Sequence, residues 1–292
     1  MPITERMVAD LCAGLYEKAL KTLPSDVMEA LRKAEEKETE PIAKRIIASI
    51  IENVKMAEES DLVVCQDTGL PSYFFKIGTK SNIVGDLKKA IAEGTLKITQ
   101  DLPLIPHCYH CITGFNPGTN LGERVPVVHF DIIPEAEYIE VTAAPIEGGG
   151  EFFNAFKNFR GLTRPDPIEF VKKFVIDTIA SAGGRPCPPL IVGIGIGTSF
   201  DKVTMIAREA SIRPLNIRHP DPFIRKIEDE LLATINKLGI GPMGMGGDTT
   251  ALAVNIETGH NGPCRPVAIK IQCWAAMKAS ARIYSDGTVV YL

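Results

Sequence analysis

The sequence predicts a globular α/β protein in which mixed β-sheets are flanked by helices. Two observations lead to this fold class. Amphipathic stretches with helical spacing alternate along the chain with short apolar runs bounded by glycine and proline. The composition is that of an ordinary folded protein, with 45% hydrophobic and 23% charged residues. No repeat or linker interrupts the chain, so we expect residues 1–292 to form a single domain, built as one lobe or two.

The first half of the chain is expected to begin with helices and to continue with strands. Apolar residues recur at helical spacing from Val8 to Leu15, and again from Ile42 to Val54 behind Pro41, a favourable residue for a first helical turn. Two helices are therefore predicted before the first strand. The later elements follow from shorter apolar runs and from clusters of glycine and proline. They are strands at residues 62–64 and 73–77, a helix at 87–92, a long irregular segment at 102–122, and strands at 125–133 and 138–142.

The second half alternates between helices and strands. The predicted elements are a tight turn at Gly148–Gly150, a helix at 167–182, a strand at 190–194, helices at 202–210 and 222–238, strands at 250–257 and 267–271, and a terminal hairpin that turns at 285–287. The glycine-rich run Gly193–Gly197 is predicted as a loop between a strand and a helix. Its dinucleotide-binding signature is incomplete, because Thr198 stands where the third glycine belongs. The amides at the start of the following helix could instead receive a carboxylate.

Charge and hydropathy exclude two classes of partner. Lys and Arg number 32 against 36 Asp and Glu, which supplies no basic field for nucleic acid. The longest apolar stretch, Pro188–Ile196, is far shorter than the roughly 20 residues of a membrane helix, and the N-terminus has no signal-peptide pattern. Seven scattered cysteines indicate thiols in a reducing compartment rather than a disulfide framework. We therefore expect a cytoplasmic protein without membrane or nucleic-acid partners.

Three of the cysteines stand beside unusual backbone. Cys65, Cys187 and Cys273 each lie at the edge of a predicted strand or loop, next to glycine, proline or tryptophan. Cys12 differs, because it lies on the apolar face of the first helix and is expected to be a core residue. Spacing alone does not identify the three as metal ligands, since pairs close in sequence are the specific signal for a metal site.

One such pair occurs in the segment His107–Cys111, where Cys108 and Cys111 are interleaved with two histidines. A closed tetrahedral zinc site needs a second pair of ligands, and the haem-attachment pattern needs histidine where Ile112 stands. These cysteines are therefore expected to be thiols of a surface loop. Zinc binding by this segment stays as an alternative function.

Several motifs gain meaning from their order along the chain. They are Cys65-Gln66-Asp67-Thr68-Gly69, Asn116-Pro117-Gly118-Thr119-Asn120, Gly148-Gly149-Gly150, Cys187-Pro188-Pro189 with Gly193 to Ser199, Arg213-Pro214 with Arg218-His219-Pro220, Leu238-Gly239-Ile240-Gly241-Pro242 and Cys273-Trp274-Ala275. This series resembles the alpha subunit of the two-subunit class I fumarases and L-tartrate dehydratases. The resemblance covers nearly the whole chain and is far more specific than any one motif.

The resemblance implies an iron-sulfur hydro-lyase with a 4Fe-4S cluster held by Cys65, Cys187 and Cys273. Three thiolates leave one iron with an open coordination position, where it acts as a Lewis acid on the hydroxyl and carboxylate of a 2-hydroxy acid. The implied reaction is the reversible dehydration of a small 2-hydroxy dicarboxylate, such as malate to fumarate, tartrate or a substituted relative. The fold implied is that of the N-terminal, alpha domain of class I fumarases.

The resemblance also implies roles for single residues. Gln66 would orient the substrate and Asp67 would transfer a proton, although Asp67 is also suited to cap its own turn. The backbone at Gly150 would approach the substrate closely. The family's catalytic histidine falls on His260, or on Asn261 if no offset is allowed.

The family's remaining catalytic groups lie on a separate beta chain. The resemblance therefore implies a beta subunit as partner, an active site at their interface, and an assembly of the alpha2beta2 type. Two departures from the family concern the second carboxylate of the substrate. Leu104 and Ile105 lie in a stretch that usually holds an arginine, and Asp248 follows a glycine pair where lysine is common. They predict an altered substrate preference, with a non-catalytic member of the family as the alternative.

Overall fold

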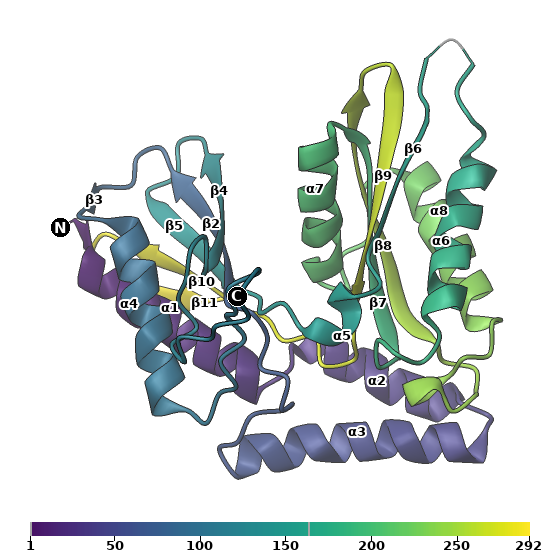
Figure 1. Cartoon of the computed structure of the whole chain (residues 1–292), viewed down its shortest axis with the longest axis horizontal. Helices are drawn as coiled ribbons and strands as arrows, with labels where there is room; N and C mark the ends of the chain where they lie inside the picture. The colour runs from purple at the N-terminus through teal and green to yellow at the C-terminus, as the bar shows by residue number, and fades with distance from the viewer. Residues whose placement is uncertain (1, 163) are drawn as a thin grey trace. The chain divides into compact units, whose positions relative to one another are not determined.

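The computed structural model describes residues 2–162 and 164–292, and these residues form two compact units (Figure 1). The first unit contains the segment that ends at Pro24, together with Val54–Gly148 and Met277–Leu292. The second contains Ser25–Asn53 and Gly149–Ala276. Helix α3 (Pro41–Glu59) contributes to both, because the division falls after Asn53. No helix within the described residues is long and apolar enough to cross a membrane.

The first unit is built on a five-stranded sheet in the order β11-β10-β5-β2-β4. Its strands are β2 (Ser72–Gly78), β4 (Val127–Ile133), β5 (Tyr138–Ala143), β10 (Ala279–Tyr284) and β11 (Val289–Tyr291). The pair β2 and β4 is parallel, and the other pairs are antiparallel. Two short strands, β1 (Ile3–Thr4) and β3 (Ile83–Val84), form a separate parallel pair.

Two helices complete the first unit. Helix α1 (Glu5–Lys21) begins at Thr4, whose hydroxyl accepts a hydrogen bond from Met7 N–H, and α4 (Leu87–Asp101) begins at Asp86, which caps it in the same manner. Helix α1 packs against β5, β10 and α4. The core between them includes the fully buried rings of Tyr16, Tyr73 and Phe75. This packing fixes the strand β2 that follows the first candidate cysteine.

The second unit is built on a four-stranded sheet in the order β6-β9-β7-β8. Its strands are β6 (Ala155–Arg160), β7 (Leu190–Thr198), β8 (Ala251–Asn261) and β9 (Cys264–Gln272). Strand β7 is parallel to β8 and antiparallel to β9. The start of β7 and the end of β9 therefore lie at the same end of this sheet, since Ile191 pairs with Gln272.

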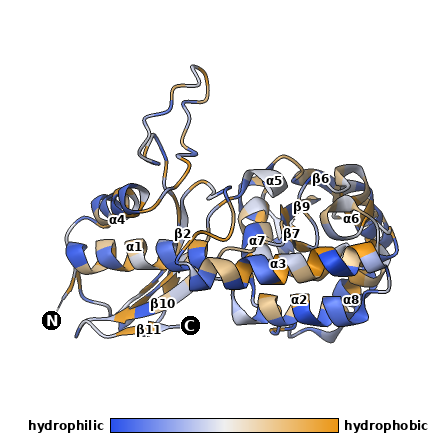
Figure 2. Ribbon diagram, turned by 90° about the horizontal axis from the view of Figure 1, so that it is seen from below, coloured by the Kyte–Doolittle hydropathy of each residue, from blue (hydrophilic) through white to orange (hydrophobic). Residues whose placement is uncertain are grey.

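Helices cover both faces of this second sheet. Figure 1 shows α7 (Phe200–Ile212) on one face, and α6 (Ile168–Ala182) and α8 (Pro222–Asn236) on the other. The larger core lies on the side of α6 and α8. The remaining elements are α2 (Ser25–Lys37), the four-residue helix α5 (Gly148–Glu151) and a 3₁₀ turn at Pro242–Gly244. In Figure 2 the ribbons of α1, α3 and α8 alternate between hydrophilic and hydrophobic residues, as expected of helices with one buried face.

The predicted fold class is confirmed, and most of the predicted elements are present. Five differences stand beside them. Three long helices, not two, precede β2, because α2 (Ser25–Lys37) was not predicted. Residues 62–64 form no strand, and β6 was not predicted. The run Gly193–Gly197 is not a loop, because it lies inside β7. The glycines at 148–150 form a short helix with Glu151 rather than a simple turn.

Candidate active site

The loop that carries Cys65, Gln66 and Asp67 belongs to the first unit and leads from α3 into β2. Its start is fixed to the end of α1, because Val64 N–H donates to the carbonyl of Leu20 at 2.8 Å. Cys65 and Asp67 are partly buried, and Gln66 is exposed. The loop therefore presents a thiol, an amide and a carboxylate in succession.

The far side of this loop is held by a buried tyrosine and a glycine turn. The Tyr16 hydroxyl lies 3.3 Å and 3.2 Å from the carbonyl oxygens of Thr68 and Gly69, to which it donates. Burial raises the pKa of Tyr16 above its ordinary value, and the charge of Asp67 adds to this effect. Gly69 has a φ of +72°, and a Cβ there would lie 2.9 Å from Pro145 Cβ. Only glycine fits this turn without strain.

Both carboxylate oxygens of Asp67 are engaged. Oδ1 accepts the Gly69 N–H at 3.2 Å, which is the Asx-turn that the sequence allowed, and Oδ2 accepts the Gly148 N–H at 2.8 Å. The His107 Nε2 lies 3.3 Å from Asp67 Oδ1, although the two atoms are not aligned as a hydrogen bond. Asp67 is thus a fixed, partly exposed carboxylate beside an imidazole, which is an arrangement suited to proton transfer.

His107 was considered in the sequence only as a metal ligand, and its position beside Asp67 was not predicted. It is carried by the irregular segment at 102–122, whose presence is confirmed. Two asparagines shape this segment: Asn120 Oδ1 accepts the His107 N–H at 2.7 Å, and Asn116 donates to the carbonyl of Pro106 at 2.7 Å. No sequence spacing links residues 67 and 107, so only the fold brings them together.

The same segment does not support the zinc alternative. Cys111 is exposed, as expected of a surface thiol, but Cys108 is only 5% exposed, and the expectation for it is wrong. Within residues 2–162 and 164–292, no group of three His, Cys, Asp or Glu side chains is arranged to hold a metal ion. Burial raises the pKa of the Cys108 thiol, which disfavours the thiolate that a metal requires.

Cys187 and Cys273 lie at the same end of the second sheet. Cys187 precedes β7 and Cys273 follows β9, and the Trp274 N–H donates to the carbonyl of Cys187 at 3.2 Å. Cys187 has a φ of +55°, a left-handed conformation that is costly for a residue with a Cβ. A strained backbone of this kind is often found at functional sites.

The glycine turn of α5 approaches the same end of the sheet. A Cβ at Gly149 would lie 3.9 Å from the Cα of Pro186, the residue before Cys187. Gly150 is buried, and the next residue, Glu151, is joined to Lys270 of β9. The second unit therefore gathers two predicted cysteine ligands and the predicted substrate-binding glycine.

His260 is not gathered with them. It is an exposed residue near the end of β8, beside Asn261, which pairs with Thr198 at the far end of β7. The cysteines lie at the other end of the sheet, where Leu190 pairs with Ala251. At ~3.3 Å per residue this separation is roughly 25 Å along the strands. The fold thus keeps His260 away from Cys187 and Cys273 of the same chain.

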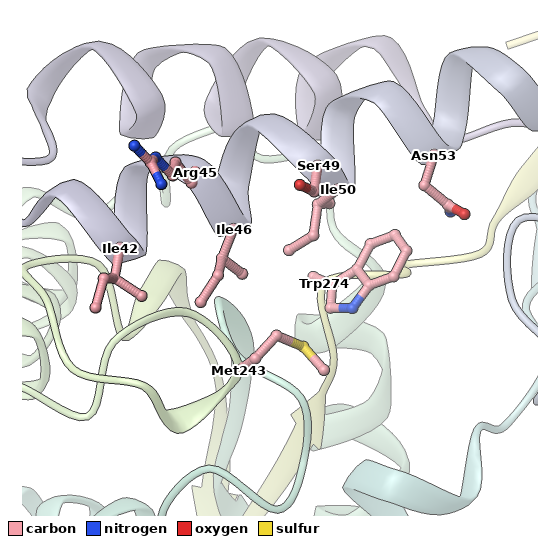
Figure 3. Close-up of a pocket in the computed structure, with 8 residues that line it drawn as sticks. All are labelled: Ile42, Arg45, Ile46, Ser49, Ile50, Asn53, Met243 and Trp274. Atoms are coloured by element: carbon pink, nitrogen blue, oxygen red, sulfur yellow. The ribbon is translucent and has the colours of Figure 1, made fainter.

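A groove of about 420 Å³ is lined by Trp274, the residue that follows Cys273 (Figure 3). The indole of Trp274 faces Ile50 of α3 on one side and the Met243 side chain on the other. The lining is mostly apolar and contains one cationic side chain, Arg45. A dicarboxylate needs two charged contacts, so this groove does not resemble its binding site.

Asp248 has a structural role. Its Oδ2 accepts hydrogen bonds from the N–H and the hydroxyl of Thr39, at 3.1 Å and 2.6 Å. The hydroxyl is the main cause of a pKa of Asp248 below its ordinary value, and the N–H adds to it. The buried Glu38 carboxylate accepts the backbone N–H groups of Asp248 and Thr249. These contacts fasten the glycine-rich loop before β8 to the connection between α2 and α3.

The geometry defines an α/β protein in which the loop from Cys65 to Asp67 of the first unit lies beside the His107 imidazole, and the second unit brings two further cysteines to one end of its sheet. The comparisons with known proteins identify its family. The family model described as fumarate hydratase (fumerase) matches residues 9–282. A protein of Methanocaldococcus jannaschii named "Putative L(+)-tartrate dehydratase subunit alpha" is 44% identical over 96% of this chain and 98% of its own length. The L(+)-tartrate dehydratase subunit alpha of Escherichia coli K12 is 31% identical over 96% of this chain and 92% of its own.

The chain belongs to the fumarate hydratase family. Membership confirms the resemblance stated from the motifs, and it makes the chain part of a hydro-lyase for a small dicarboxylate. The zinc-binding and non-catalytic alternatives are not favoured by these findings.

Proposed function

We propose that this chain is the alpha-type subunit of an iron-sulfur hydro-lyase and that residues 1–292 act as one functional domain. The observation that carries the proposal is the placement of Cys187 and Cys273 at one end of the second sheet, in a chain of the fumarate hydratase family. Cys65 is the third proposed ligand, and its loop holds the carboxylate that the reaction needs.

Three cysteine thiols are the type of donor that holds a 4Fe-4S cluster. All seven cysteines are described as thiols rather than disulfides. Of the three proposed ligands, Cys65 and Cys187 are partly exposed and Cys273 is buried beside Trp274, so solvent reaches part of the set. When bound, such a cluster with three thiolate ligands supplies a Lewis-acidic iron with an open position. Thiols that must stay reduced also support a cytoplasmic location.

The chain's own residues then bind and orient the substrate. We assign to Asp67 the transfer of a proton to and from the substrate oxygen, because two N–H groups hold its carboxylate in one orientation. His107 lies beside it, with Nε2 at 3.3 Å from Asp67 Oδ1. Gln66 is exposed and is assigned to orient the substrate, and Gly150 offers backbone free of a side chain to a substrate carboxylate.

His260 requires a second copy of the chain if it is catalytic. A residue roughly 25 Å along the strands from Cys187 cannot reach the same centre. An alpha2beta2-type assembly would supply His260 of one alpha chain to the site of the other. The proposed role of His260 therefore depends on the proposed assembly.

The substrate proposed is a 2-hydroxy dicarboxylate of the malate and tartrate class. Both relatives described above carry the name of an L(+)-tartrate dehydratase subunit alpha, and such a name supports a beta chain as partner. The segment around Ile105 lacks an arginine, which favours a substrate whose distal end depends less on such a contact, as in a hydroxylated or alkyl-substituted diacid.

The test is an anaerobic assay of the alpha chain co-expressed with its beta chain, against a panel of malate, L-tartrate and methyl-substituted malates. We expect dehydration activity in the pair, with L-tartrate or a substituted malate preferred, and none in the alpha chain alone. Steady turnover by the single chain would contradict the partner requirement. A pair that contains iron and sulfide but dehydrates no member of the panel would contradict the enzymatic proposal.

A further inference from the structure

The glycine turn of α5 is fastened to β9 by two side chains. Glu151 Oε2 accepts hydrogen bonds from Lys270 Nζ at 2.7 Å and from Asn154 Nδ2 at 2.8 Å. Asn154 Oδ1 in turn accepts the backbone N–H of Ile271 at 2.9 Å. The residue that follows Gly150 is thus tied to β9 two and three residues before Cys273.

Lys270 is an unusual anchor because it is buried. Its side chain is 7% exposed, whereas that of Glu151 is 53% exposed. Lys270 alternates along β9 with Ile269 and Ile271, which face the core under α6 and α8, so it points to the side of α7. A lysine in such a place is stable only with a charged partner, which Glu151 provides.

The surroundings of Glu151 favour its carboxylate form. Burial acts to raise the pKa of the Glu151 carboxyl, but Lys270, Asn154 and the nearby Arg208 of α7 outweigh it, and the pKa lies below its ordinary value. Arg208 is itself 6% exposed. The carboxylate is therefore held by buried positive charge on one side of the sheet, unlike a mobile ion pair on the surface.

Three successive glycines need such support. Glycine has more backbone freedom than any other residue, and this freedom must be lost when the turn adopts one conformation. Its first residue is held at one point, where the Gly148 N–H donates to Asp67 Oδ2 at 2.8 Å. A Cβ at Gly149 would meet nothing nearer than the Cα of Pro186, at 3.9 Å. The contacts of Glu151 are what tie this turn to the strand end that bears Cys273.

We propose that Lys270 and Glu151 are positioning residues that hold the backbone of Gly150 in place for a substrate carboxylate. This inference rests on the proposed function, because it assumes that Gly150 contacts substrate. Neither charged side chain needs to touch the substrate itself. They hold the turn in one conformation before the substrate binds, so that substrate binding does not carry the entropic cost of ordering it.

The consequence is a specific kinetic signature. Removing the clamp makes the turn mobile before substrate binds, which weakens binding more than it slows the chemical step. Lys270→Met should raise KM by about ten-fold while kcat changes by less than about three-fold. Lys270→Arg keeps the ion pair and should restore most of the affinity. Iron content should equal that of the wild type, because the cysteines are unchanged.

A double variant separates positioning from simple destabilisation. Lys270→Met alone leaves the Glu151 carboxylate without its lysine. The double variant Glu151→Gln with Lys270→Met removes both charges of the pair. If the pair only supported the fold, the double variant would recover both stability and KM. We expect stability to recover and KM to stay high, because the turn is still unfastened from β9.

A matched control is Lys172→Met. Lys172 of α6 is also a mostly buried lysine in an ion pair: it donates to Glu169 at 2.8 Å and to Glu230 at 2.6 Å, and its side chain is 16% exposed. It has no link to the glycine turn. This variant should leave KM, kcat and iron content at wild-type values.

The experiment uses the anaerobically purified alpha-beta complex, with L-tartrate and malate as substrates, and measures KM, kcat, iron and amide hydrogen exchange over residues 148–154. Faster exchange of these amides with a raised KM and full iron content is expected for Lys270→Met. Wild-type KM, unchanged exchange or a loss of iron in that variant would overturn the proposal. If the wild-type complex proved inactive, the proposed function would fail, yet unchanged exchange would still count separately against the clamp.

Discussion

Replacing Gly193 with alanine tests why β7 is rich in glycine. Gly193 faces α7, and a Cβ there would lie 2.3 Å from the carbonyl oxygen of Ala207 and 2.4 Å from the amide nitrogen of Ser211. Ordinary contact begins at 3.4 Å, so the new methyl group falls more than 1 Å short of the space that it needs. Both obstacles are backbone atoms of a packed helix, which cannot rotate away as a side chain would.

The magnitude follows from this geometry. Overpacking a well-packed core costs about 1–3 kcal/mol, and backbone obstacles place this site at the upper end. Alanine recovers about 0.5–1 kcal/mol by restricting the unfolded chain. We therefore expect the free energy of unfolding to fall by about 2 kcal/mol, which lowers the Tm by roughly 4–8 °C in a unit of this size.

The assay is urea and thermal unfolding followed by tryptophan fluorescence. The single tryptophan, Trp274, lies in the same unit as β7 and reports its unfolding. Gly262→Ala is the matched control, because nothing lies within 4 Å of its Cβ position, and its effect should stay within about 0.5 kcal/mol. If Gly193→Ala were as stable as the wild type but lost affinity for dicarboxylate, the glycines would serve a ligand and the packing account would be refuted.

Three further predictions concern charge. Arg213→Met removes the partner of the buried Glu228 and should lower the free energy of unfolding by about 3–5 kcal/mol in urea titrations. Arg218→Met removes only the exposed ion pair with Asp229 and should cost less than about 1 kcal/mol. Equal losses in the two variants would contradict the assignment of Arg213 to a buried ion pair. Burial raises the pKa of Glu151, but Lys270, Asn154 and Arg208 outweigh it, so that the pKa in the folded protein lies below its ordinary value. The stabilisation of the fold by the Glu151 carboxylate is therefore complete at neutral pH and is lost as the pH falls below about 4.5. The Tm difference between wild type and Glu151→Gln should therefore shrink as the pH falls through the lowered pKa, and a difference that stays constant on acidification would exclude this source. Ile105→Arg should raise kcat/KM for malate relative to L-tartrate by about ten-fold or more in the alpha-beta complex, and an unchanged ratio would show that this position does not set specificity.

Hydrophobic periodicity predicted the elements that have one buried face. The helix from Ile42 and the strand at 73–77 follow the expected spacing and are present as α3 and β2. Helix α2 was not predicted, because its buried residues are few, Val27, Met28 and Leu31, among many charged ones. The run at 62–64 is apolar but too short to pair, and its N–H groups donate instead to the ends of two helices, Leu62 to Ala57 of α3 and Val64 to Leu20 of α1.

Strand β7 shows the limit of local reasoning. Its glycines follow an apolar run and precede a helix, which is also the pattern of a ligand-binding loop. The difference lies in α7, which packs so closely that Gly193 and Gly195 leave no space for a side chain. That helix follows in sequence, but its closeness to β7 is a tertiary property. The sequence pattern alone therefore could not decide between the two.

The candidate site could be predicted only in part for the same reason. The cysteines were identified through a resemblance of motifs, not through spacing, because Cys187 and Cys273 are brought together by antiparallel strands far apart in sequence. The pairing of Lys270 with Glu151 spans 119 residues and leaves no local signal. His260 fits a family motif, yet its distance from the cysteines becomes visible only in the register of β7 and β8.

The most direct test of the central claim is the iron and acid-labile sulfide content of the anaerobically purified alpha-beta complex in a set of cysteine variants. The account predicts about four of each per alpha chain in the wild type. Cys65→Ser, Cys187→Ser and Cys273→Ser should each lose the cluster, while the exposed Cys111→Ser should keep it. A cluster that survives Cys187→Ser, or that disappears with Cys111→Ser, would contradict the proposed site.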